Sequence, residues 1–95
     1  MKVQRRERLA EFARAHRDAR TALDAWLRSM EGSNVGNLVE LKRTFRSADY
    51  VRPYTVFNIS GNKYRLIALV DYELGLASVE QVLTHAEYDR GRWKH

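Results

Sequence analysis

The stretch VFNISGNKYRLIALVDY, residues 56–72, decides the fold of this chain. Its β-branched and aromatic residues alternate with polar ones on both sides of a Gly-Asn pair, a pattern typical of two antiparallel strands joined by a tight turn. If Gly61 and Asn62 are the turn residues with positive φ angles, the cross-strand partners follow. The predicted pairs are Ser60 with Lys63, Ile59 with Tyr64, Asn58 with Arg65, and Phe57 with Leu66.

This register separates two faces of the hairpin, because successive side chains of a strand point to opposite sides. The apolar face should pack on helices. It comprises Phe57, Ile59, Tyr64, Leu66, Ala68 and Val70. The other face is expected to display polar side chains at its turn end, namely Asn58, Ser60, Lys63 and Arg65.

The N-terminal part of the chain has helical spacing instead. Apolar residues lie on one face of RRERLAEFARAH (5–16), and the next segment, DARTALDAWLRSME (18–31), repeats the pattern with Asp18 as a plausible N-cap and Gly32 as the stop. We expect two antiparallel helices here. MKV, at residues 1–3, is a possible short edge strand.

Three further signals complete the expected fold. Asn37 followed by Glu40 predicts a capping box for a shorter helix that ends at Phe45. The single proline, Pro53, separates the helical part from the strand part. LASVEQVLT (76–84) predicts a third strand, which the connection containing Gly75 joins to the hairpin in a register that the sequence leaves open. The chain is therefore expected to be one α+β domain over residues 1–95.

Composition narrows the functional classes. The 95 residues carry a formal charge of +5 and no cysteine, which removes disulfides, thiolate zinc sites and a cysteine nucleophile and suits a reducing cytoplasm. The charged N-terminus and the lack of a long apolar run predict neither export nor a membrane partner. Seven Lys/Arg against three Asp/Glu in residues 1–20, and six against two in 37–65, favour nucleic acid as the first partner. An acidic protein partner, or only a soluble basic surface, is the alternative.

Lys63 and Arg65 stand two positions apart in the expected hairpin. Strand geometry would place both cations on one face, about 6 to 7 Å apart, where they could hold one phosphodiester from two sides. An ordinary solvated sheet face is the other interpretation of this pair. The apolar opposite face favours function, because it would support the cations rigidly.

The segment THAEYDR, residues 84–90, combines structural and chemical signals. Thr84 and Glu87 match a capping box that would start a short helix. His85 could transfer protons near neutral pH, although a lone histidine is also commonly a surface or half-buried residue. A metal site made of His85, Glu87 and His95 has a spacing that matches no closed site, so no metal is expected.

No nucleotide-binding glycine pattern or serine nucleophile elbow is present. Together, VFNISGNKYRLIALVDY and THAEYD resemble the HigB-like branch of the RelE superfamily, the toxins of type II toxin–antitoxin systems. The helix with AWL and the FRSAD stretch before the sheet agree with that resemblance. It implies a small α+β domain with N-terminal helices on one face of a twisted antiparallel sheet, an active groove on the other face, and a short C-terminal helix.

The resemblance also implies a function, an endoribonuclease that cleaves mRNA, usually on the ribosome, by attack of the 2′-oxygen on the adjacent phosphate without metal or cofactor. In that scheme Lys63 and Arg65 stabilise phosphate charge, His85 transfers protons, and Tyr88 orients or stacks on a base. Further RNA contacts are expected at Asn62, Arg52, Glu87 and Arg90. The implied partners are mRNA, the ribosome and a cognate antitoxin, expected to be a helix-turn-helix HigA-like protein. A non-enzymatic RNA- or protein-binding module on the same fold is the competing interpretation.

Overall fold

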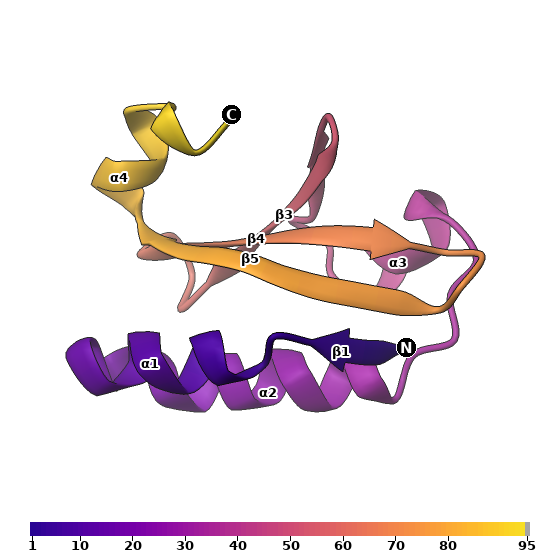
Figure 1. Cartoon of the computed structure of the whole chain (residues 1–95), viewed down its shortest axis with the longest axis horizontal. Coiled ribbons are helices and arrows are strands. Elements are labelled where there is room, and N and C mark those ends of the chain that lie inside the picture. Colours follow the sequence, from indigo (N-terminus) through magenta and orange to yellow (C-terminus); the bar gives the residue numbers. More distant parts are fainter. Residues whose placement is uncertain (95) are drawn as a thin grey trace.

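Two helices lie side by side beneath a five-stranded sheet in the computed structural model, which describes residues 1–94 (Figure 1). The helices are α1 (Glu7–Ala15), η1 (Arg17–Ala19), α2 (Arg20–Glu31), α3 (Leu38–Thr44), α4 (His85–Asp89) and η2 (Arg92–Lys94). The strands are β1 (Lys2–Gln4), β2 (Asp49–Val51), β3 (Tyr54–Ile59), β4 (Tyr64–Asp71) and β5 (Leu76–Thr84). The expected α+β class is confirmed.

The sheet has the order β1-β5-β4-β3-β2. All its neighbouring strands are antiparallel except β1 and β5, which pair in parallel, so the sheet is mixed and the expectation of a wholly antiparallel sheet is wrong at this edge. The pairing sets Val3 opposite Ala77, and both side chains are buried. The edge strand expected at MKV is therefore present, in an orientation that its sequence did not indicate.

The predicted hairpin register is confirmed. Ile59 pairs with Tyr64, Asn58 with Arg65, and Phe57 with Leu66. The turn has another shape than expected, because the positive φ angles occur at Ser60 (53°) and Gly61 (66°), one position earlier than predicted. As a consequence β4 begins only at Tyr64, and Lys63 belongs to the turn.

The apolar face of the hairpin packs on the helices as predicted. Its residues, of which Val70 is only partly buried, lie in the main core with others from α1, α2 and α3, including Leu9, Leu23, Trp26, Met30 and Leu41. The Trp26 and Phe45 rings both meet the Phe57 ring edge-on, at centroid distances of 5.4 and 5.1 Å. This core fixes the sheet against the helices, and so fixes the position of everything on the opposite face.

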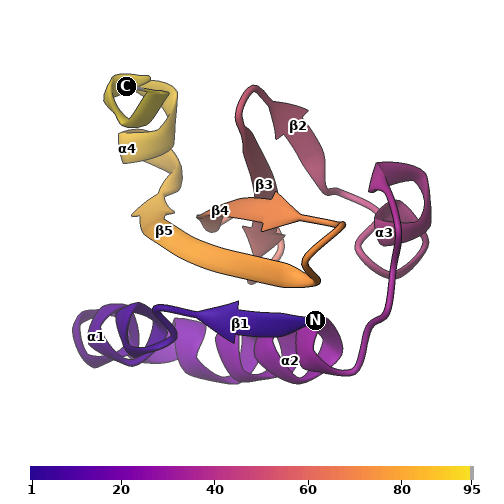
Figure 2. The same ribbon diagram turned by 45° about the vertical axis from the view of Figure 1, so that its right-hand side comes forward.

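The opposite face of the sheet is not the open polar surface that we expected. Figure 2 shows α4 and the β2–β3 connection standing on that side, away from α1 and α2. A second apolar cluster fills it, with Val56, Ile67 and Trp93 buried and Val51, Tyr54, Leu83 and Tyr88 packed around them. The C-terminal η2 segment supplies Trp93, which the hairpin pattern alone could not reveal.

Several local expectations need correction. Asp18 does not cap α2, because η1 precedes that helix and Ala19 occupies the N-cap. Asn37 caps α3 as predicted by accepting from the Glu40 backbone, but the Glu40 carboxylate accepts from Gly36 instead of completing the box. Strand β2 precedes Pro53 and was not predicted; the proline lies in the β2–β3 turn, after a cis peptide bond.

One β-bulge interrupts the pairing of β4 with β5. Ile67 pairs with Gln81, whereas the next residue, Ala68, pairs with Val79, so Glu80 is the extra residue. The Glu80 side chain accepts hydrogen bonds from Arg5 and Ser78, and its backbone carbonyl accepts one from Arg8. The bulge is thereby tied to the start of α1.

No helix within residues 1–94 is long and apolar enough to span a membrane.

Candidate active site

The strongest candidate site lies where the β3–β4 turn meets the start of α4. The backbone N–H of His85 donates to the Lys63 carbonyl at 2.9 Å, which joins the two segments directly. The two sequence motifs, some twenty residues apart in the chain, are therefore neighbours in space. Arg65, the second residue of β4, lies at the centre of this region.

Arg65 is a buried cation, only 8% exposed. Its guanidinium donates to Asn62 Oδ1 at 2.5 Å, to the Tyr64 carbonyl at 3.1 Å and to the Asn62 carbonyl at 3.3 Å. All three acceptors are neutral, and no carboxylate of the described residues forms an ion pair with it. A buried charge without a counterion is costly, so this position favours an incoming anion such as a phosphate.

Tyr88 stacks within the same site. The Arg65 Cζ atom lies 5.4 Å from the centre of its ring, and the Trp93 ring stacks on it at 4.9 Å and 16°. Trp93 also donates from Nε1 to the Tyr88 carbonyl at 2.9 Å. Because protein groups already contact the ring, its hydroxyl is better suited than its face to meet a substrate. Trp93 was not singled out for the site, since only the folded C-terminal segment brings it there.

His85 is the first residue of α4, and its side chain is 42% exposed. Its Nδ1 lies 2.9 Å from Asp89 Oδ2, one helical turn later. A carboxylate at this position orients the imidazole ring, which leaves Nε2 for an external partner. Asp89 is thus a functional candidate that the motif analysis missed, although its i,i+4 spacing from His85 was visible in the sequence.

The capping box predicted at THAE is confirmed. Thr84 Oγ1 accepts from the Glu87 backbone at 3.2 Å, and Glu87 Oε1 accepts from the Thr84 backbone at 2.9 Å. The bond from the Thr84 backbone lowers the pKa of the Glu87 carboxyl below its usual value. Glu87 is therefore ionised and engaged in the helix start, which makes it a poor direct contact for phosphate.

Lys63 departs from the predicted arrangement. Its Nζ lies 2.9 Å from Asp18 Oδ2, while Asp18 Oδ1 accepts from the Tyr64 hydroxyl at 2.6 Å. Tyr64 belongs to the helix-facing side of the sheet, so Lys63 and Arg65 do not share one strand face. The expected pair of cations about 6 to 7 Å apart on that face is wrong, because Lys63 lies in the turn and pairs with η1.

The contacts among Asp18, Lys63 and Tyr64 shift the pKa values of all three groups. The hydrogen bond from Tyr64, followed by the contact to Lys63, lowers the pKa of Asp18. The Asp18 carboxylate in turn raises the pKa of Lys63 and that of Tyr64. The His16 ring lies against this group, stacked on Phe12 at 4.3 Å and edge-on to Tyr64 at 5.4 Å. Neither Asp18 nor His16 was predicted here; tertiary contact alone reveals them.

The remaining predicted residues lie further apart. Asn62 is in the site through its bonds to Arg65, whereas Arg90 is exposed at the end of α4 and Arg52 is exposed in the β2–β3 turn. Residues 1–94 hold no group of three or more potential metal ligands. His95, considered for a metal site, lies outside the described residues.

The geometry defines a class, a small α+β domain with a buried arginine and a histidine–carboxylate pair at one end of its sheet. Residues 19–91 match the family model of the HigB toxin, described as the RelE-like toxic component of a toxin–antitoxin system. This chain belongs to that family.

Curated relatives agree with this membership. The chain is 40% identical over 52 residues to the mRNA interferase toxin HigB of Escherichia coli strain K12, and equally to the mRNA interferase HigB of Escherichia coli O157:H7 and of Shigella flexneri. Each alignment covers 52% of this chain and 50% of the relative. The match thus spans about half the length of these curated relatives.

Proposed function

We propose that this chain is the toxin of a type II toxin–antitoxin system and cleaves mRNA on the translating ribosome, in the cytoplasm. The observation that carries the proposal is Arg65, a buried guanidinium without a carboxylate partner among the described residues, which contacts the ring of Tyr88 on the same short helix that begins with a histidine held by a carboxylate. The names of the relatives, which describe mRNA interferases, support it.

The proposed reaction is attack of the RNA 2′-oxygen on the adjacent phosphorus, which releases the 5′-oxygen of the next nucleotide. Arg65 would bind the phosphate and stabilise the charge that develops on its oxygens. His85 would transfer a proton through Nε2 while Asp89 holds Nδ1. The Tyr88 hydroxyl would orient the substrate, and no cofactor takes part in this scheme.

Other residues have secondary roles in the proposal. Asn62 positions Arg65, and the exposed Arg52 and Arg90 contact the RNA backbone at longer range. Glu87 acts through the start of α4. Lys63 supplies positive charge near the site, although its bond to Asp18 makes it a weaker candidate for the reacting phosphate than Arg65. The proposed partner is a helix-turn-helix antitoxin of the HigA type.

The test is inducible expression in a bacterial host, with growth and the integrity of a translated reporter message measured together. We expect growth arrest and cleavage within the message by the wild-type chain, and neither by His85→Gln. Arg43→Gln, an exposed change on α3, is the matched control and should behave as wild type. Growth arrest with an intact message would instead support the non-enzymatic binding module.

A further inference from the structure

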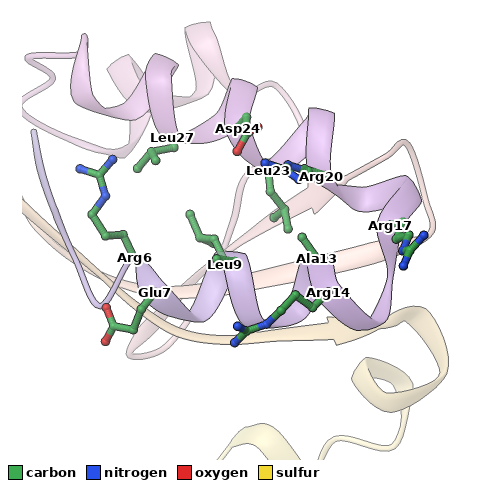
Figure 3. A pocket seen from close by; sticks show the side chains of 11 residues that line it. Arg6, Glu7, Leu9, Ala13, Arg14, Arg17, Arg20, Leu23, Asp24 and Leu27 are labelled. Atoms are coloured by element: carbon green, nitrogen blue, oxygen red, sulfur yellow. The ribbon is translucent and has the colours of Figure 1, made fainter.

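A groove of about 1070 Å³ runs between α1 and α2. Figure 3 looks into this groove with the strands of the sheet behind the helices. It therefore opens on the side of the molecule opposite α4 and the candidate active site (Figure 2). No residue of that site lines it, so it requires a separate explanation.

The groove has an apolar floor. Leu9 and Ala13 of α1 face Leu23 and Leu27 of α2, and Ala13 and Leu27 remain partly exposed. Ala10 and Ala13 are small, which leaves space for another backbone to approach α1 closely. A floor of this kind, open along two antiparallel helices, suits the apolar stripe of a third helix.

The rim of the groove is basic. Four arginines line it against two carboxylates, those of Glu7 and Asp24. Arg6 pairs with Glu31 at 2.8 Å, but Arg14, Arg17 and Arg20 form no ion pair with any of the described residues. Figure 3 shows Arg17 at the α1–α2 connection, with Arg14 on the α1 side of the groove and Arg20 on the α2 side. The rim therefore presents three cations, unpaired among the described residues, around an apolar floor.

We propose that this groove binds an acidic amphipathic helix of the antitoxin, with its carboxylates at Arg14, Arg17 and Arg20. The inference rests on the proposed function for the identity of the partner. RNA fits the groove less well, because the floor is apolar and offers no aromatic ring on which a base could stack. The antitoxin helix would then bind on the side of the sheet that α1 and α2 cover, and Arg65 would stay uncovered.

The first test uses synthetic helical peptides of about 18 residues, five turns of helix, with leucines on one face and glutamates on the other. Their binding to the His85→Gln chain, residues 1–95, is measured by fluorescence anisotropy. We expect the glutamate peptide to bind at least about tenfold more tightly than the same peptide with lysines. Reversing Arg14, Arg17 and Arg20 to glutamate should abolish this preference. Reversing the exposed Arg28, Lys42 and Arg43 should not, and equal binding of both peptides would overturn the proposal.

The second test asks whether the groove neutralises toxicity. The active chain is co-expressed with the protein encoded by the adjacent gene, and growth is measured for the wild type and for both triple variants. The groove variant should still arrest growth but escape rescue, whereas the control variant should be rescued. Rescue of a toxic, folded groove variant would reject the docking site and leave the proposed function intact. A wild-type chain that never arrests growth would contradict the proposed function itself.

Discussion

Arg65 and Tyr88 form one stacked unit, in which the guanidinium carbon of Arg65 lies 5.4 Å from the centre of the Tyr88 ring. The cation is buried on β4, and the ring comes from α4, so the contact joins the sheet to the C-terminal helix. Each side chain limits the movement of the other. A change at either one should therefore affect both substrate binding and the position of α4.

Arg65→Lys tests whether the planar guanidinium is needed. Lysine keeps the positive charge but cannot donate to Asn62 and Tyr64 in the same fork. We expect single-turnover cleavage on programmed ribosomes to fall about 100-fold, the scale of losing one transition-state donor. Arg65→Ala is less informative than Arg65→Lys, because the side chain is buried and its removal would leave a cavity. Wild-type cleavage by Arg65→Lys would show that only charge matters there.

His85→Gln should lower the cleavage rate by about 100-fold or more, as loss of acid–base catalysis usually does, with little change in melting temperature. Asp89→Asn keeps the imidazole but removes the carboxylate 2.9 Å from Nδ1. It should cause a smaller loss than His85→Gln. If both variants cleave as fast as wild type, the pair is structural and proton transfer belongs to another group.

The capping box gives a prediction about stability and pH. Thr84→Ala should lower the free energy of unfolding by about 1 kcal/mol and reduce activity only in part. The pKa of Glu87 is lower in the folded chain than its usual value of 4.5, so its contribution is complete above that pH and is lost as the pH falls through the folded pKa. The stability difference between wild type and Glu87→Ala should therefore be largest near pH 7 and shrink in acid. Chemical denaturation at several pH values measures it.

Asp18→Asn tests the contact between η1 and the hairpin turn. Asp18 has a lowered pKa, so its contribution should be present above the usual value of 3.8 and disappear in acid. Lys63 and Tyr64 have raised pKa values. Their contributions to the free energy of unfolding should therefore persist below their usual pKa values, 10.5 for Lys63 and 10.0 for Tyr64, and disappear as the pH rises further. We expect a lower melting temperature for Asp18→Asn at neutral pH and a smaller difference at both extremes. Asp24→Asn on α2 is the control.

Trp93→Ala should lower the free energy of unfolding by about 3 to 5 kcal/mol, as for other large aromatic truncations. Trp93 is 4% exposed and stacks on Tyr88 from the C-terminal segment. The loss should therefore also release α4 and weaken cleavage. Thermal melting and the cleavage rate of the folded fraction separate the two effects. An unchanged melting temperature would mean that the segment does not pack on the sheet in solution.

Local pattern predicted much of this fold. The register from Phe57 to Leu66 followed from alternation and the Gly-Asn pair, the strand at 76–84 matches β5, and the capping box at Thr84 needed only residues three apart. Each of these is encoded by neighbours in the chain. Membership of the HigB family followed from the same two stretches and is confirmed.

Tertiary contacts determine the features that local sequence patterns could not predict. Asp18 had the features of an N-cap, but Tyr64 and Lys63, more than forty residues later, bind its carboxylate instead. A shift of the positive φ angles by one position moved Lys63 out of the strand and away from the face of Arg65. The second apolar cluster depends on Trp93 folding back over the sheet, which no short pattern encodes.

The bulge at Glu80 shifts by one residue the alternation that decides which side chains of β5 face the helices. Before it, the odd-numbered Ala77 and Val79 pair with helix-facing residues of β4; after it, the even-numbered Val82 and Thr84 do so. If Glu80 were kept but paired regularly, without a bulge, the alternation would continue unchanged, Leu83 would turn toward the helices, and the strand would deliver α4 with the opposite orientation. The side of the sheet that receives His85 and Tyr88 is thus decided by one residue that belongs to neither motif.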